Sequence, residues 1–284
     1  KGWEAQFEVV EYEPAAAASS GQVHRAVTRG RMDLIRLLVK KGASLAVSDK
    51  KGNSLLHLAV EHHREEVLQF LLERGVKPDP QDQEGRTPLH RAKERNDVDS
   101  AYLLIAFDAD PERADAYGEE PLAWLAQRCL RGLQEKQTLD AQRDHPCLQI
   151  KALRAPTLHL AAAGGQTDLV HLLIQSGASP LERFSLAPGL SMAGTALHAA
   201  TSAGHAQTVA ALLKHGLPVD SPDAAGWTSL HRAVWQEQAA MVQQLLHAGA
   251  NPRRKTGSGS DAMDLARQKH STAILKMLQK ERSR

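Results

Sequence analysis

Apolar side chains recur along the chain in short groups with the spacing of one face of an α-helix. The clearest groups are Leu68, Leu71 and Leu72, then Val209, Leu212 and Leu213, and then Val242, Leu245 and Leu246. Positions i, i+3 and i+4 share one side of a helix, so each group predicts an amphipathic helix with one buried face. A residue that tolerates the left-handed conformation follows each second helix, as a helix end requires. These residues are Gly42, Gly75, Asp108, Gly177, Gly216 and Gly249.

The helices belong to a repeat with a period close to 33 residues. Each copy carries the pattern Leu-His-x-Ala or a remnant of it, and the histidine position marks the unit. The markers are His24, His57, His90, Ala123, His159, His198, His231 and Asp264. A glycine stands five residues before most markers and an aspartate eight before several, and both residue types favour tight turns. Self-similarity at this period predicts an array of about eight stacked helix-turn-helix units.

The segment GRTPLHRA (85–92) resembles the consensus of the ankyrin repeat. GWTSLHRA (226–233) and GNSLLHLA (52–59) differ from that consensus at one or two residues, and the resemblance extends over residues 21–284. It implies an all-α fold, an ankyrin-repeat solenoid of helix-turn-helix units with projecting β-turn fingers. In that family the concave face of the stack usually holds another protein.

Two parts of the array depart from the repeat. The fourth unit has Ala123 as its marker, and polar residues stand where its second helix should be apolar. These are Gln134, Gln137 and Thr138. We therefore predict a degenerate fourth unit with an insertion over 128–155, which should open more readily than residues 196–250. The loop 178–194 carries extra residues and is predicted to protrude as a longer finger.

Residues 1–20 form a separate N-terminal extension or linker. Apolar residues alternate with polar ones there, the period-2 pattern of a strand. They are Trp3, Ala5, Phe7 and Val9. The chain begins at Lys1 without a methionine, so we expect it to be part of a longer protein.

Composition and charge argue against several classes of protein. With 42% hydrophobic residues the chain can build a core, and its formal net charge of +2 gives no overall field to hold nucleic acid. No apolar run is long enough to span a bilayer, so no integral membrane association is expected. Cys129 and Cys147 are too few for a disulfide framework, and no Asn-x-Ser/Thr site is present. The expected location is cytoplasmic.

The sequence offers no reaction chemistry. The resemblance implies that five marker histidines, together with the turn threonines, join successive units. They are His57, His90, His159, His198 and His231. The cluster of His62, His63, Glu65 and Glu66 has metal-ligand chemistry but is interpreted as a solvated corner, and GSGSDA (257–262) lies in a turn rather than after a strand. Cys147 near His145 is not expected to form a nucleophile pair. We predict no catalytic residues, no metal, no cofactor and no enzyme activity.

Candidate partner-binding residues lie at the positions that face the groove and finger tips in the family. Trp227 and Trp235 are the sharpest signal, because tryptophan is enriched among interface residues that dominate binding. The alternative is that one of them packs structurally, as we expect for Trp124. Further candidates are Tyr117, Met192, Arg86, Arg95 and Arg128. The arginines either meet an acidic partner or belong to a solvated face with neighbouring glutamates, and the second is favoured slightly.

The predicted function is non-catalytic binding of another protein or peptide segment through the concave groove, with no small-molecule substrate. One alternative is the targeting module of an enzyme whose catalytic domain lies upstream of Lys1. A second is a membrane-surface or nucleic-acid tether through the basic C-terminal residues 251–284. The tether predicts binding that weakens steeply with salt.

Overall fold

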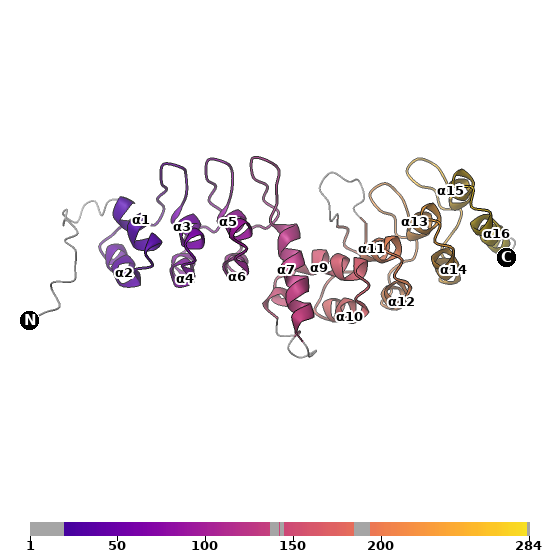
Figure 1. Cartoon of the computed structure of the whole chain (residues 1–284), viewed down its shortest axis with the longest axis horizontal. Helices are drawn as coiled ribbons and strands as arrows, with labels where there is room; N and C mark the ends of the chain where they lie inside the picture. Colours follow the sequence, from indigo (N-terminus) through magenta and orange to yellow (C-terminus); the bar gives the residue numbers. More distant parts are fainter. Residues whose placement is uncertain (1–19, 137–141, 143–144, 185–193, 283–284) are drawn as a thin grey trace, which may run out of the picture. The chain divides into compact units, whose positions relative to one another are not determined.

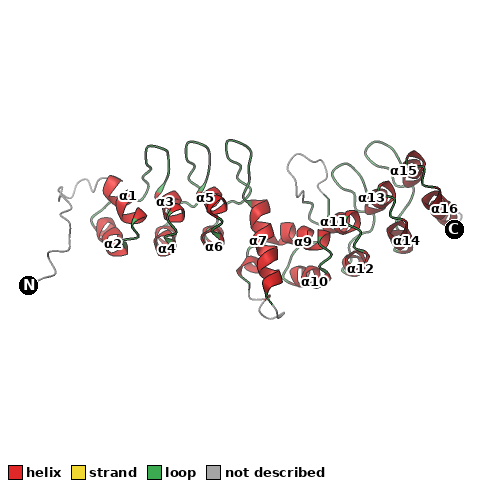
Figure 2. Ribbon diagram, viewed as in Figure 1, coloured by secondary structure: helices red, strands yellow, loops and turns green. Residues whose placement is uncertain are grey.

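The computed structural model describes residues 20–136, 142, 145–184 and 194–282, which form helices joined by loops and two isolated β-bridges (Figures 1 and 2). The chain divides into two compact units, Lys1–Pro121 and Leu122–Arg284, with the boundary inside the fourth repeat. The all-α solenoid prediction is confirmed. The predicted strand near the N-terminus, Gln137, Thr138 and most of the 178–194 loop lie outside the described residues.

The described residues of the first compact unit form three helix pairs. They are α1 (Ser20–Thr28) with α2 (Met32–Lys40), α3 (Leu55–Glu61) with α4 (Glu65–Glu73), and α5 (Pro88–Arg95) with α6 (Val98–Ala106). The first helices of the pairs lie in one row and the second helices in another, and the loops between pairs project on one side (Figure 1). Leucines at the predicted positions fill the space between the rows, and Leu68 and Leu71 are fully buried.

The second unit begins with a single long helix, α7 (Leu122–Glu135), followed by the short 3₁₀-helix η2 (Pro146–Gln149). Four helix pairs complete it. They are α9 (Lys151–Ala163) with α10 (Thr167–Gln175), α11 (Ala196–Ser202) with α12 (Ala206–Lys214), α13 (Ser229–Trp235) with α14 (Ala239–His247), and α15 (Ala262–Gln268) with α16 (Thr272–Arg282). The predicted left-handed residues after the second helices are confirmed, including Asp108 at φ 66°.

Four of the described fingers close on an aspartate side chain, and the finger of the eighth unit closes on Thr256, whose hydroxyl accepts from the Ser260 N–H at 3.2 Å. In the seventh unit Asp223 Oδ1 accepts hydrogen bonds from the backbone N–H groups of Ala225 and Trp227, both at 2.8 Å. Asp49, Asp82 and Asp115 do the same in their own fingers. Gly226 has φ 78°, and a Cβ there would lie 2.6 Å from the Gly257 backbone nitrogen. Only glycine therefore allows this close approach between neighbouring fingers.

Five of the marker histidines contact the backbone of the following finger, namely His57, His90, His159, His198 and His231. His198 is buried, its Nδ1 accepts from the Thr195 N–H at 3.1 Å, and its Nε2 lies 3.0 Å from the Trp227 carbonyl oxygen of the following finger. Because Nδ1 accepts, the ring proton sits on Nε2 and is donated to that carbonyl. The same arrangement occurs at His57, His90 and His231.

His159 departs from this arrangement because α9 begins before the usual cap position. Its Nδ1 lies 2.7 Å from the Ala155 carbonyl oxygen and its Nε2 lies 2.8 Å from the Gly194 carbonyl oxygen. A neutral imidazole carries one N–H, so it donates to only one of these two oxygens at a time. His159 therefore holds its neighbours through a different set of hydrogen bonds from the other markers.

Replacing His198 or His231 by alanine should lower the unfolding free energy by about 1–3 kcal/mol, because a buried N–H and a buried carbonyl lose their partners. Urea denaturation of the chain measures this loss. The matched control is His247→Ala, an exposed histidine at the end of α14, whose effect should stay within about 0.5 kcal/mol. Equal stability of the marker variants and the control would contradict the stacking role.

The fourth unit is packed differently from the prediction. Helix α7 continues to Glu135, and its inner face buries Leu125, Cys129 and Leu133. Gln134 is exposed on the outer side of this helix, so its polar side chain faces water and leaves no polar gap in the core. The expectation that Gln134 occupies a packing position of a second helix is therefore wrong.

Cys129 and Cys147 form a disulfide, which corrects the conclusion drawn from the cysteine count. Helix α7 carries Cys129 on its inner face and η2 carries Cys147 against it, with a Cα–Cα distance of 5.6 Å. The argument from cysteine content for a cytoplasmic location therefore loses its basis. His145 Nδ1 lies 3.1 Å from Cys147 Sγ, a disulfide sulfur that carries no proton to exchange.

Candidate partner-binding surface

Trp227 and Trp235 form a pair in the seventh repeat. Trp227 ends the finger and is half-buried, whereas Trp235 is the last residue of α13 and is 38% exposed. Their ring centroids lie 5.7 Å apart with an interplanar angle of 84°, an edge-to-face contact. Such pairs stabilise each other by about 0.5–1.5 kcal/mol beyond the area they bury. The pairing holds Trp235 in place while part of its ring stays open to solvent.

A lysine from the next unit completes this site. Lys269, the C-cap of α15, places its ammonium group 4.1 Å from the centre of the Trp235 ring. A cation over the face of an indole is attracted by the ring's negative charge density. The tryptophan pair therefore presents an edge that is aromatic and positively charged together.

The last finger adds uncompensated positive charge to the second compact unit, which also contains the tryptophan pair. Arg253, Arg254 and Lys255 are exposed in the loop between α14 and α15. Among the described residues no carboxylate forms an ion pair with these side chains or with Lys269. Their charges are thus free to meet an anionic group from outside the chain.

Two of the predicted arginines, Arg86 and Arg95 of the third repeat, are instead neutralised within the fold. Arg86 is 19% exposed and forms ion pairs with Asp82, Glu84 and Glu94 at 2.8–3.4 Å. Arg95 pairs with Glu61 at 3.2 Å. The structure therefore fits the alternative of a solvated face in which glutamates compensate these arginines.

The remaining candidates are scattered. Tyr117 lies at the tip of the finger closed by Asp115 and is 75% exposed, without the second aromatic ring that Trp235 has. Arg128 is half-buried on α7, in the second unit. Met192 lies outside the described residues. Trp124, expected in the core, is half-buried on α7, whose neighbouring Leu125 is fully buried.

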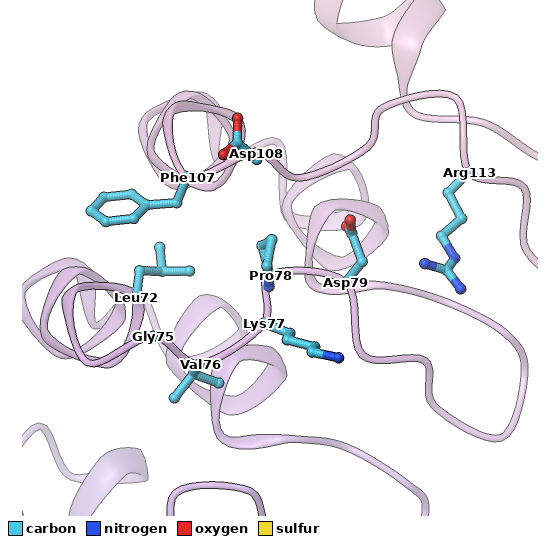
Figure 3. Close-up of a pocket in the computed structure, with 9 residues that line it drawn as sticks. All are labelled: Leu72, Gly75, Val76, Lys77, Pro78, Asp79, Phe107, Asp108 and Arg113. Atoms are coloured by element: carbon cyan, nitrogen blue, oxygen red, sulfur yellow. The ribbon is translucent and has the colours of Figure 1, made fainter.

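A pocket of about 490 Å³ in the first unit was not anticipated from the sequence. It lies where α4 and α6 end, with Leu72 and Phe107 at one end and Lys77, Asp79 and Arg113 toward the other (Figure 3). Burial raises the pKa of Asp79 above its ordinary value, although the carboxylate accepts a hydrogen bond from the Asp110 N–H. The pocket combines an apolar end with mixed charges and holds no arrangement of nucleophile and base.

Buried ion pairs between finger and helix were also missed. Asp223 Oδ2 lies 2.6 Å from Arg232, directly after the marker, and Asp82 Oδ2 lies 2.9 Å from Arg91. Burial acts to raise the pKa of Asp82, but hydrogen bonds from the Arg86 and Glu84 backbone and the Arg86 side chain lower it overall. The signal was present in the sequence, because the aspartate eight before a marker occurs together with an arginine one after it in these two units.

Two family models match the chain. The model described as ankyrin repeats (many copies) matches residues 23–72 and 56–105, and the model described as ankyrin repeats (3 copies) matches residues 158–256. Together they cover well over half of the sequence. The chain belongs to the ankyrin-repeat family. Ankyrin-repeat arrays are typically non-catalytic protein-interaction modules.

Similar proteins share part of this ankyrin-repeat array. The chain is 37% identical over 78 residues to calmodulin-binding transcription activator 6 of Arabidopsis thaliana, covering 25% of the chain and 9% of that protein. It is 33% identical over 146 residues to the B-cell lymphoma 3 protein homolog of Mus musculus, covering 40% of the chain and 33% of that protein. The chain thus spans about a third or less of the length of these relatives.

Among solved structures, the ankyrin repeat domain of Bcl-3 is similar to the chain, with a TM-score of 0.46 and 21% identity over 90% of this chain and 97% of that one. In the part of the ankyrin-repeat chain that the structure describes, every helix is too short or too polar to cross a bilayer. Within the same residues, no three side chains of His, Cys, Asp or Glu gather in a way that could hold a metal ion.

Proposed function

We propose that this ankyrin-repeat array is a non-catalytic binding module that holds a segment of a partner protein at the Trp227–Trp235 pair. The observation that carries the proposal is the open aromatic edge beside unpaired cations in the second unit. A large apolar ring left in water costs about 25 cal/mol per Å² of exposed surface, which binding would recover. Interface residues that dominate affinity are enriched in tryptophan and arginine.

The charge pattern defines the chemistry of the partner segment. In the second unit Lys269, Arg253, Arg254 and Lys255 lack carboxylate partners among the described residues, whereas Arg86 of the first unit has three. A matching segment carries a large apolar side chain for the tryptophan edge and acidic residues for the cations. Complementary charge raises the association rate and fixes orientation more than it adds affinity.

A displayed library of random peptides, selected on the purified chain, tests this proposal. The enriched peptides should combine an aromatic or large aliphatic residue with Asp or Glu. Trp227→Ala combined with Trp235→Ala should weaken their binding more than about tenfold, since truncating a tryptophan of this kind costs at least about 2 kcal/mol. Titration calorimetry gives the affinities, and far-ultraviolet circular dichroism checks the fold.

The matched control is Arg86→Ala with Arg95→Ala, which removes two groove charges that the fold already neutralises. In this variant the affinity of the selected peptides should change little, and the main change should be in how that affinity depends on salt concentration. Should the double tryptophan variant unfold, Trp235→Ala alone is the fallback, because Trp235 is the more exposed ring. Peptides that bind the folded tryptophan variant as tightly as the parent would place the site elsewhere.

A further inference from the structure

Two histidines from neighbouring repeats meet on the second-helix side of the second unit. His171 lies on α10, and His215 is the C-cap of α12. His171 Nδ1 is 2.7 Å from His215 Nε2, and the ring centroids are 4.9 Å apart with an interplanar angle of 55°. The hydroxyls of Thr167 and Thr208, earlier on the same two helices, lie 3.0 Å apart, so the helices stay close along this edge.

The stacking of repeats does not require this pair. Counted from the markers, the same two positions in the following units hold Ala210 and Ala248, and each alanine has the same class of exposure as the histidine it corresponds to. Ala248 is also the C-cap of its helix, as His215 is. The two imidazoles therefore meet at positions where packing alone is satisfied by a methyl group.

The facing nitrogens form the beginning of a metal site. Imidazole nitrogen is a preferred ligand of Cu²⁺, Ni²⁺ and Zn²⁺, with metal–nitrogen distances of about 2.0–2.1 Å for zinc. Two nitrogens bound to one such ion lie about 3 Å apart, so the present 2.7 Å needs to widen by a few tenths of an ångström. Each ring must also turn, so that its lone pair points at the ion instead of at the other nitrogen. His215 is exposed, so its side chain can make this rotation.

The proton balance of binding is simple. In the hydrogen-bonded pair one facing nitrogen carries a proton, which it donates to the lone pair of the other. When a metal binds, the donor ring shifts that proton to its far nitrogen through solvent, and both facing lone pairs coordinate the ion. Two neutral imidazoles thus bind one divalent cation without net release of a proton.

We propose that His171 and His215 bind a divalent transition-metal ion, Cu²⁺ more tightly than Ni²⁺ or Zn²⁺, which then joins α10 to α12. No third His, Cys, Asp or Glu joins these two in the described part of the chain, so water completes the coordination. The order of metals follows the general affinity series for nitrogen ligands. A bound ion would stabilise the second unit, because it links two repeats that are separate in sequence.

Titration calorimetry of the full chain with copper chloride, at less than one equivalent, tests the site. Copper should occupy one tightest site, and His171→Ala and His215→Ala should each weaken it by at least about tenfold. The matched controls His247→Ala and His62→Ala remove exposed histidines elsewhere and should leave that site unchanged. Zinc chloride should raise the thermal midpoint of the parent but not of the double variant.

Electron paramagnetic resonance of the copper-loaded chain supplies a readout that folding alone does not move. Hyperfine splitting from two nitrogen ligands should be seen in the parent and from one in His171→Ala or His215→Ala. Circular dichroism verifies the fold, and His171→Gln and His215→Gln repeat the test with side chains of more similar size. A tightest copper site that survives the double substitution, or copper without two nitrogen ligands in the parent, would overturn the proposal.

Discussion

Reduction of the Cys129–Cys147 disulfide should lower the unfolding free energy of the second unit by about 3 kcal/mol. The bond closes a loop with a sequence separation of 18 residues, and the chain-entropy model assigns about this value to a loop of that length. Cys129 on α7 and Cys147 on η2 are both buried, and reduction removes the bond that ties η2 to α7. Urea denaturation with and without dithiothreitol, together with a thiol assay that confirms two free thiols, measures the effect.

The matched control is Cys129→Ala with Cys147→Ala, whose stability should be the same with and without reductant. Hydrogen exchange locates the effect: protection should fall in α7 and η2 and stay unchanged in α13 and α14. The order expected from the sequence, with 128–155 opening before 196–250, should be most pronounced in the reduced chain. A fully reduced chain that is as stable as the oxidised one would show that packing alone holds η2 in place.

The helix pairs and fingers could be predicted because each depends on residues close together in sequence. A glycine before the marker, an aspartate in the finger and a left-handed residue after the second helix each determine a local backbone conformation. Asp223 and Gly226 have the same roles in the structure as their positions in the repeat indicate. Repetition made these weak local signals strong, since the same residue type returned at the same place.

The fourth unit could not be predicted because its own sequence lacks the repeat's signals. The length of α7 depends on a buried face through Leu125, Cys129 and Leu133, which the expected register did not follow. The contact between Cys129 and Cys147 depends on how the segment between them returns, and the spacing of two cysteines does not determine that.

Side-chain contacts between neighbouring repeats were the other feature that the sequence could not predict. Lys269 reaches Trp235, and His215 reaches His171, from positions in different repeats that share no local pattern. Their proximity follows from the stacking distance and from side-chain direction at each register position. The neutralisation of Arg86, by contrast, involves Asp82 and Glu84 within four residues, and the neighbouring acidic residues already favoured that interpretation.

The chain should lose stability steeply between about pH 6.5 and pH 4, because its marker histidines are buried in the neutral form. Burial lowers the pKa of His198 from 6.5 to about 4, and burial likewise lowers the pKa values of His57, His159 and His231. Between these two pH values the unfolded chain binds protons that the folded chain does not, so the unfolding free energy falls as the pH falls.

The size of the effect follows from the shift at His198. At this residue the full stabilisation, about 3 kcal/mol, is present above the unfolded pKa and is lost as the pH falls through the folded pKa. The acidic groups have their effect at lower pH. The pKa values of Asp49, Asp82 and Asp115 lie below their ordinary value of 3.8 in spite of partial burial, because their carboxylates accept hydrogen bonds. Their protonation therefore lowers the unfolding free energy only below that pH.

Substitution of His198 by glutamine should flatten this pH dependence. Glutamine does not titrate, so His198→Gln should be less stable than the parent at pH 7.5 and nearly as stable at pH 4.5. His159→Gln is the internal comparison: burial lowers the pKa of His159 as well, so its removal should also flatten the pH dependence. Urea midpoints at pH 7.5, 5.5 and 4.5 measure both slopes. A parent whose midpoint is constant over this range, or equal slopes in the parent and His198→Gln, would show that the marker histidines are not what couples stacking to protons.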